Sequence, residues 1–202
     1  LIQSVFGGLT VILKLPDAIS TTHLALAFLF LSLVTVLTAA TSPARMAQQD
    51  MRPLSTIKML GVLSATLIFL QSVLGGVVRH TGAGLVCPDV PLCFGEWIPP
   101  LEAVSVITHF THRLLGIIVL ISLLVLAYKA SDLQRGSQIR TFAMTAAVLG
   151  VFQVILGFLS VYSLLAIIPV SLHTLIAATL LSCTTYLVSI SWRERLILQQ
   201  LD

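Results

Sequence analysis

Long apolar runs, separated by short polar segments, make up most of this chain. A bilayer core needs about 20 apolar residues in a helix. Four runs reach that length, and they lie at roughly residues 18–41, 57–79, 104–128 and 141–165. A fifth run extends from about 169 to 191, and residues 1–13 look like the second half of an earlier span. The pattern predicts an all-α fold, a polytopic transmembrane helix bundle.

Composition agrees with a lipid environment. The chain is 57% hydrophobic and 9% charged, whereas a soluble domain carries about 25% charged residues. The pI of about 9.0 does not indicate nucleic-acid binding, because most basic residues lie in short connectors and in the tail: Arg45, Arg52, Lys58, Lys129, Arg135, Arg140, Arg193 and Arg195. The positive-inside rule therefore places these connectors in the cytoplasm and the loop at residues 80–103 outside.

The chain also contains an internal repeat. Residues 1–37 align without a gap onto residues 151–187. The matches include residue types that are rare in lipid-facing helices, and these pair Gln3 with Gln153, Gly7 with Gly157 and His23 with His173. A third copy of the opening places Gln71 four residues before Gly75. A repeat of helix pairs predicts two pseudo-symmetric four-helix halves, related as parallel repeats. One half is complete at residues 57–192, and residues 1–42 are the end of the other.

Four of the five histidines lie at a similar depth near the outer ends of spans, namely His23, His109, His112 and His173. His80 follows the second full span. A lone histidine in a membrane helix often forms a hydrogen bond with a neighbouring helix, but ionisable groups in a membrane are costly and usually functional. Neutral imidazole is a good iron ligand, so His112 and His173 could ligate the two faces of one haem. Two axial histidines leave no open iron position, which suits electron transfer better than oxygen binding.

This haem interpretation carries a geometric expectation. We expect His112 and His173 on antiparallel neighbouring helices, which must splay because directly packed helices lie 8–10 Å apart. Gly75 and Gly157 would make room for the ring. His109, one turn nearer the outside, is the rival ligand to His112.

Two further groups of polar residues each leave two interpretations open. Arg113, which follows His112 inside a span, either extends to the outer headgroups or pairs with a haem propionate. Arg79, at a span end, has the same two options. The Gln-x3-Gly pairs are typical of close helix packing with a glutamine hydrogen bond across the interface. Their glycines would also let a flat macrocycle approach the backbone.

The outer loop holds two of the three cysteines, Cys87 and Cys93, while Cys183 lies in an apolar run. The C-x5-C spacing differs from the C-x-x-C of thioredoxin-like proteins and from the C-x-x-C-H of covalent haem attachment. An oxidised pair persists outside the cytoplasm, and a turn rich in Gly and Pro can bring two Cα atoms within about 7 Å. We predict a disulfide, with two free thiols as the alternative.

Several of these segments resemble the haem A synthase family. The resemblance rests on the run from Gly75 to Asp89 (GGVVRHTGAGLVCPD), on Pro91-Leu92-Cys93, on Ile98-Pro99-Pro100 and on His112-Arg113. It implies the oxidation of a ring methyl of haem O to the formyl group of haem A. It also implies a haem b between His112 and His173, and His23 as a ligand of the substrate haem. The expected setting is the bacterial plasma membrane or the mitochondrial inner membrane. Expected partners are membrane lipid, haem O synthase, a cytochrome oxidase and further copies of the chain.

The chain departs from the family pattern at two positions. The family's first-half Glu-x-x-His-Arg motif is expected upstream of Leu1, because the sequence begins without Met and inside an apolar run. In the second-half counterpart His109 takes the place of the Glu, so no catalytic residue is assigned. Val90 stands where the family usually has Trp. A di-haem b-type cytochrome that only passes electrons is the alternative function, and a transporter with parallel repeats does not explain histidines gathered at one end.

Overall fold

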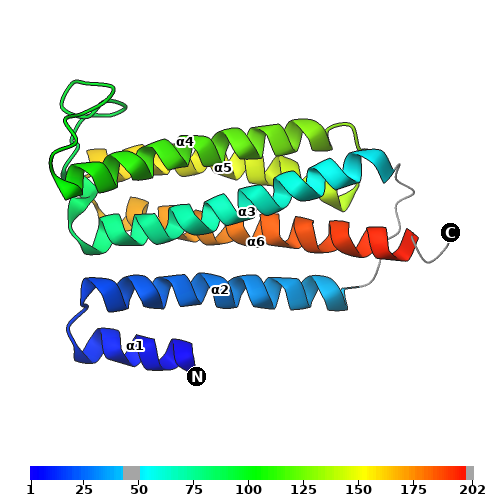
Figure 1. The fold of residues 1–202 in the computed structure, drawn as a ribbon, viewed down its shortest axis with the longest axis horizontal. Coiled ribbons are helices and arrows are strands. Elements are labelled where there is room, and N and C mark those ends of the chain that lie inside the picture. Colours follow the sequence, from blue (N-terminus) through cyan, green and yellow to red (C-terminus); the bar gives the residue numbers. More distant parts are fainter. Residues whose placement is uncertain (43–50, 199–202) are drawn as a thin grey trace.

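The computed structural model describes residues 1–42 and 51–198, with side chains for 1–42 and 54–192. Over these residues it contains six α-helices and one short 3-10 helix. The elements in chain order are α1 (Ile2–Ile12), α2 (Asp17–Thr41), α3 (Met51–His80), η1 (Ala83–Leu85), α4 (Val104–Ala130), α5 (Gln138–Tyr162) and α6 (Ile167–Leu198) (Figure 1). Within the described residues the only β-type pairing is an isolated bridge between Cys93 and Glu96. The predicted all-α polytopic bundle is confirmed.

Helices α2 to α6 each contain a segment long and apolar enough to cross a membrane. These segments agree with the five predicted spans to within about three residues at each end. Differences of three residues occur at the two ends of α5, which begins at Gln138 and ends at Tyr162 rather than at residue 165. Leu164 and Leu165 stop this helix because both adopt positive φ, at 54° and 62°, which a continuing right-handed helix does not allow. The chain is a multi-pass integral membrane protein.

Helices α3 to α6 close into a four-helix ring. Each helix in the order α3, α4, α5, α6 packs on the next, and α6 packs back on α3. Helix α2 lies against α3 and α6, and α1 lies against α2 (Figure 1). Successive helices of the ring run in opposite directions, so α4 and α6, with α5 between them, run parallel to each other. They lie on a diagonal of the ring and are not adjacent. The expectation that His112 and His173 lie on antiparallel neighbours is therefore wrong.

Two clusters of buried apolar side chains fill the ring away from its outer end. One cluster includes Ile57, Leu126 and Leu187, and the next includes Val119 and Leu180. Val119 and Leu180 are each seven residues, or about two turns, further from the outer end than His112 and His173. Among the described residues of α4 and α6 the buried members of the two clusters end there, and partly buried side chains such as Ile176 lie nearer the histidines.

The repeat seen in the sequence is also present in the backbone. Lys14 and Leu15, between α1 and α2, have φ values of 57° and 60°, close to those of Leu164 and Leu165 between α5 and α6. The amide of Leu15 bonds to the carbonyl of Thr10 at 2.7 Å, and the amide of Leu165 bonds to the carbonyl of Ser160 at 2.8 Å. Non-glycine residues seldom adopt this left-handed conformation. Its recurrence at matched positions shows that both helix pairs are built alike.

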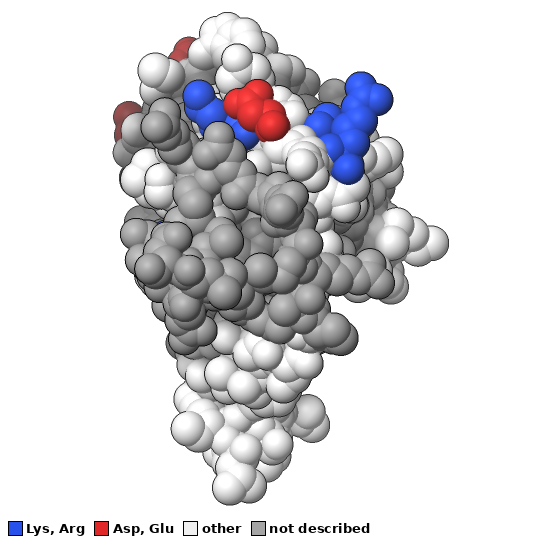
Figure 2. Space-filling model, turned by 90° about the vertical axis from the view of Figure 1, so that its right-hand side faces the viewer, with Lys and Arg blue, Asp and Glu red and all other residues white. Residues whose placement is uncertain are grey.

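The two kinds of connector lie at opposite ends of the bundle. The Cys loop (residues 81–103) joins α3 to α4, and α4 runs from it to the basic connector that holds Arg135 (Figure 1). Figure 2 shows Lys and Arg side chains at that second end, on both sides of an acidic side chain. Lys58 places its Nζ 3.7 Å from the ring centre of Trp192 there. Of the other predicted cytoplasmic cations, Arg45 lies outside the described residues, as do the side chains of Arg52, Arg193 and Arg195.

Candidate functional site

Two histidines face each other across the ring near its outer end. His112 lies about two turns into α4, and His173 lies in the second turn of α6. Both side chains are partly buried. Their imidazoles are close enough to interact electrostatically. The ring therefore brings together the two residues that the sequence singled out as a pair.

Each of these imidazoles rests on a glycine of a neighbouring helix. A Cβ built on Gly75 would lie 3.0 Å from Cε1 of His112, and one on Gly157 would lie 3.3 Å from Cε1 of His173. Real Cβ atoms rarely come so close to another atom, so a larger residue would displace the ring. These glycines thus make room for the imidazoles, whereas the sequence had led us to expect room for a macrocycle.

The glutamine one turn before each glycine bonds to the same histidine. Gln71 donates from Nε2 to the backbone carbonyl of His112 at 2.9 Å, and Gln153 donates in the same way to His173 at 2.9 Å. These are the hydrogen bonds across helix interfaces that the Gln-x3-Gly pattern predicted. They connect α3 to α4 and α5 to α6 at the level of the histidines.

A third copy of this arrangement lies between α1 and α2. A Cβ on Gly7 would lie 3.0 Å from Cε1 of His23. The amide nitrogen of Gln3 lies 3.5 Å from Nε2 of His23, so this glutamine reaches the imidazole itself. His23 is therefore seated on α1 as His173 is seated on α5, in agreement with the repeat.

Buried polar atoms without partners accompany all three histidines. Nδ1 of His23, His112 and His173 is buried and has no hydrogen-bond partner among the described residues. The same is true of the Oε1 atom of the glutamine in each copy. Buried polar groups are nearly always hydrogen-bonded, so three matched exceptions point to a shared role.

His109 is built into the protein in a different way. Its Nδ1 lies 2.9 Å from the carbonyl oxygen of Ala83, and its Nε2 accepts a hydrogen bond from Nε of Arg113 at 3.1 Å. The side chain is buried. Both ring nitrogens are thus engaged by protein groups, which leaves His109 without a lone pair for a metal. Of the two rivals, His112 is the better candidate ligand.

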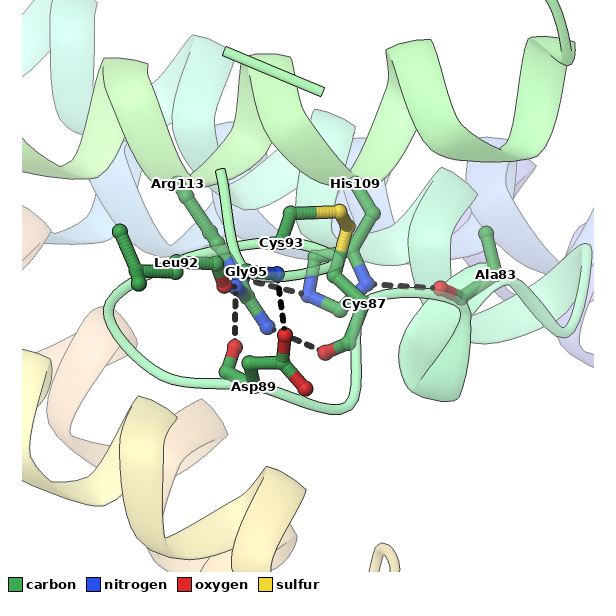
Figure 3. Close-up of a disulfide and its surroundings, with 8 residues drawn as sticks. All are labelled: Ala83, Cys87, Asp89, Leu92, Cys93, Gly95, His109 and Arg113. Atoms are coloured by element: carbon green, nitrogen blue, oxygen red, sulfur yellow. Dashed lines mark hydrogen bonds between the residues drawn. A yellow bond between two sulfur atoms is a disulfide. The ribbon is translucent and has the colours of Figure 1, made fainter. Parts of the chain in front are cut away.

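Arg113 holds the Cys loop. Its guanidinium donates from Nη1 to the carbonyls of Asp89 and Leu92 at 2.8 and 2.7 Å, and from Nη2 to the carbonyl of Cys87 at 2.6 Å. Figure 3 shows Arg113 and His109 projecting from α4 toward the loop. With the Nε bond, four of the five guanidinium donors are used. Sequence reasoning considered headgroups and a propionate for Arg113 and missed these carbonyl acceptors.

The Cys loop is closed by a disulfide. The structure joins Cys87 and Cys93, with 4.8 Å between their Cα atoms. Both are buried, at 0% and 2% exposure, and pack against Val106 of α4. Asp89 accepts from the amide of Gly95 at 2.6 Å within the loop. Cys183 remains a free thiol.

Arg79 and His80 end α3 on the same side as the loop. The Arg79 side chain is exposed. His80 contacts Thr21 through Nδ1 at 2.9 Å, which joins the end of α3 to the start of α2. His80 was assigned to the loop from the sequence, but the structure places it as the last residue of the helix.

The donor set fits a haem better than a bare metal ion. Within the described residues no group of three or more His, Cys, Asp or Glu side chains could hold a metal ion. Two imidazoles suffice when a porphyrin supplies the other four nitrogen ligands. The sequence interpretation assumed directly packed helices 8–10 Å apart, whereas α4 and α6 are not adjacent in the ring.

Comparisons with known proteins identify the family of the chain. The model of the COX15-CtaA family, described as cytochrome oxidase assembly protein, matches residues 1–185. A heme A synthase of Halalkalibacterium halodurans is 28% identical over 96% of this chain and 66% of its own length. That of Symbiobacterium thermophilum is 32% identical over 86% of this chain and 58% of its own length. That of Shewanella oneidensis is 27% identical over 78% of this chain and 53% of its own length. The chain thus spans less than two thirds of the length of these relatives, and it belongs to the cytochrome oxidase assembly protein family that includes the haem A synthases.

Proposed function

We propose that the chain is part of a haem A synthase, an oxidoreductase that converts haem O to haem A by oxidising a ring methyl to a formyl group. Relatives named heme A synthase support the reaction class. The observation that carries the haem assignment is the pair His112 and His173, seated alike on facing helices near the outer end of the ring.

In this proposal α3 to α6 would hold a haem b, with His112 and His173 as its iron ligands. When bound, the haem would supply single-electron transfer. Arg79, and the one unused Nη2 donor of Arg113, are the proposed partners of the propionates, since guanidinium binds carboxylate well.

His23 is the proposed ligand of the substrate haem O. It occupies a seat of the same design, formed by α1 and α2 instead of α5 and α6. The resemblance assigns this position to the half of the protein in which the methyl group is oxidised. His109 stands at the position of the family's carboxylate, and its two nitrogens hold the Cys loop, so we assign it no part in the chemistry.

A b-type cytochrome that passes electrons without modifying haem is the second candidate. The observation in its favour is that the seats of His23 and His173 are alike, as two electron-carrying haems would require. The two candidates differ in their product. Cells that make haem O together with the full-length protein accumulate haem A only if the protein is a synthase, which chromatography of extracted haems measures.

The ligand assignment has its own test. Reduced-minus-oxidised spectra of the purified full-length protein would be compared for His112→Ala, His173→Ala and His109→Ala. We expect the first two variants to lose the low-spin b-type signal and the third to keep it. The assignment is wrong if His112→Ala keeps the signal and His109→Ala loses it.

The setting of the protein belongs to the same proposal. We place it in the bacterial plasma membrane or the mitochondrial inner membrane, with the Cys loop outside and the basic connectors in the cytoplasm. Haem O synthase, a cytochrome oxidase and further copies of the chain are the proposed partners. Labelling of an introduced cysteine at exposed Arg135 by a membrane-impermeant reagent in intact cells would contradict this orientation.

A further inference from the structure

The same three-residue unit occurs three times in this protein, and we call it the imidazole seat. It consists of a glutamine, a glycine four residues later on the same helix, and a histidine of another helix that packs on the glycine. The three seats are Gln3, Gly7 and His23; Gln71, Gly75 and His112; and Gln153, Gly157 and His173. A repeated unit allows a detail in one copy to be checked against the other two.

In every seat the glycine fixes where the imidazole lies. The ring presents its Cε1 corner to the glycine, and for His112 both ring nitrogens lie farther away, at 3.6 and 3.7 Å from the same Cβ position. This contact limits how far the ring can move toward the neighbouring helix. It does not distinguish one ring nitrogen from the other.

The glutamine of each seat places a polar side chain beside the histidine. Gln71 and Gln153 are anchored through Nε2 to the backbone carbonyl of their own histidines. The Oε1 atom shares a carbon with Nε2, so it is held near the same residue. In the first seat Nε2 of Gln3 lies 3.5 Å from Nε2 of His23, so a glutamine at this position reaches the imidazole, there with its amide nitrogen and not with Oε1.

Two complementary atoms in each seat are buried and unpaired. Among the described residues Oε1 of Gln71 and of Gln153 has no donor, and Nδ1 of His112 and of His173 has no partner. An unpaired polar group is unfavourable in a low-dielectric interior. An N–H at Nδ1 directed at Oε1 would satisfy both atoms together. A histidine that binds a metal through one nitrogen almost always donates its other N–H to such an acceptor.

We propose that Gln71 and Gln153 are positioning residues that fix the tautomer of the two haem ligands. When haem is bound, Oε1 of each glutamine accepts a hydrogen bond from Nδ1–H of its histidine, a bond that the structure does not record, and this leaves the Nε2 lone pair for iron. The inference rests on the proposed ligation of haem by His112 and His173. The inference assigns a role to Oε1 of the glutamine, because the hydrogen bond between the helices uses Nε2 alone.

The proposal predicts an effect on the iron. A hydrogen bond accepted from Nδ1–H makes the imidazole a stronger donor to iron and so favours the oxidised state. Removal of the acceptor should therefore raise the reduction potential of the haem. An acceptor of equal or greater strength should leave the potential unchanged or lower it.

The test is a redox titration of the purified, haem-loaded full-length protein. Gln71→Leu removes the acceptor, and Gln71→Glu keeps an oxygen acceptor while it loses the Nε2 donor. Gln153→Leu and Gln153→Glu repeat the comparison at the other ligand, in case one position does not tolerate substitution. Ser64→Ala is the matched control, because it removes a buried hydrogen bond between α3 and α4, from Ser64 to Ser122 at 3.1 Å, away from the histidines.

We expect the Leu variants to raise the potential, the Glu variants to leave it unchanged or lower it, and Ser64→Ala to leave it unchanged. An unshifted potential in the Leu variants, or an upward shift in both Leu and Glu variants, overturns the inference. His112→Ala separates this failure from failure of the proposed function. If that variant keeps the b-type signal, the ligation itself is wrong, whatever the glutamine variants show.

Discussion

Arg113 donates from Nε to Nε2 of His109, one turn earlier on α4, at 3.1 Å. Through this contact two residues of one helix form a single clamp on the Cys loop. Arg113 holds the carbonyls of Cys87, Asp89 and Leu92, and His109 contacts that of Ala83. Since His112 lies between the two clamp residues, the loop and the proposed ligand share one turn of helix.

Arg113→Lys should loosen the Cys loop. Lysine keeps the charge but lacks the planar fork that reaches several carbonyls at once. Hydrogen bonds to charged groups contribute about 1.5–3 kcal/mol each, so loss of one such bond should favour loop opening by roughly 10-fold or more. The disulfide is buried, so its reduction requires that opening. The rate of reduction by a water-soluble thiol measures the effect.

Arg79→Lys is the control for that experiment. Arg79 is exposed at the end of α3 on the same side of the membrane, and it makes no contact with the loop that the structure records. The disulfide of this variant should be reduced at the same rate as the disulfide of the unchanged protein. Equal rates in all three proteins would contradict the clamp.

His109→Phe should lower stability but spare the haem spectrum. Phenylalanine fills a similar volume, but it leaves Nε of Arg113 and the carbonyl of Ala83 without their partner. An unsatisfied buried group costs about 1–3 kcal/mol, so with two such groups the free energy of unfolding should fall by about 2–6 kcal/mol. Thermal unfolding in detergent and the reduced-minus-oxidised spectrum measure the two effects. Loss of the spectrum in a folded variant would mean that His109 is a ligand after all.

Gly75→Ala should displace the imidazole of His112. The added Cβ would lie 3.0 Å from Cε1, and that ring cannot move away without losing its position in the seat. Haem content per protein, measured by absorbance, should fall well below that of the unchanged protein. Gly8→Ala is the matched control, because a Cβ there meets no atom within 4 Å and alanine favours a helix over glycine by about 1 kcal/mol. A normal haem content in Gly75→Ala would exclude a role of the glycine in seating the histidine.

Sequence reasoning identified the spans well because a bilayer imposes a length of about 20 apolar residues on each. It also identified the residues of the seats, such as Gln3, Gly7 and His23, since rare residue types stand out in apolar helices, but it did not predict that each histidine packs on its glycine. It failed on the lateral order of the helices, because hydropathy does not report which helix packs on which. His112 and His173 were therefore expected on adjacent helices instead of across a diagonal.

The clamp on the Cys loop was missed for a different physical reason. The acceptors of Arg113 are backbone carbonyls, which every residue carries, so no residue type in the loop indicates them. The spacing of His109 and Arg113 was the one available signal, because residues four apart lie on the same face of a helix. That spacing predicts that the two side chains are in contact. Only the structure of the loop shows which backbone carbonyls they bind.

The disulfide itself can be tested against a thiol in the same chain. Cys87 and Cys93 are joined, whereas Cys183 lies in α6 as a free thiol. Alkylation of the denatured, non-reduced protein should therefore add one label, at Cys183, and reduction beforehand should add labels at all three positions. Peptide mass spectrometry locates the labels. Labels on Cys87 and Cys93 without reduction, in protein that carries its haem signal, would show that the loop is held by Arg113 and His109 alone and that the site does not require the bridge.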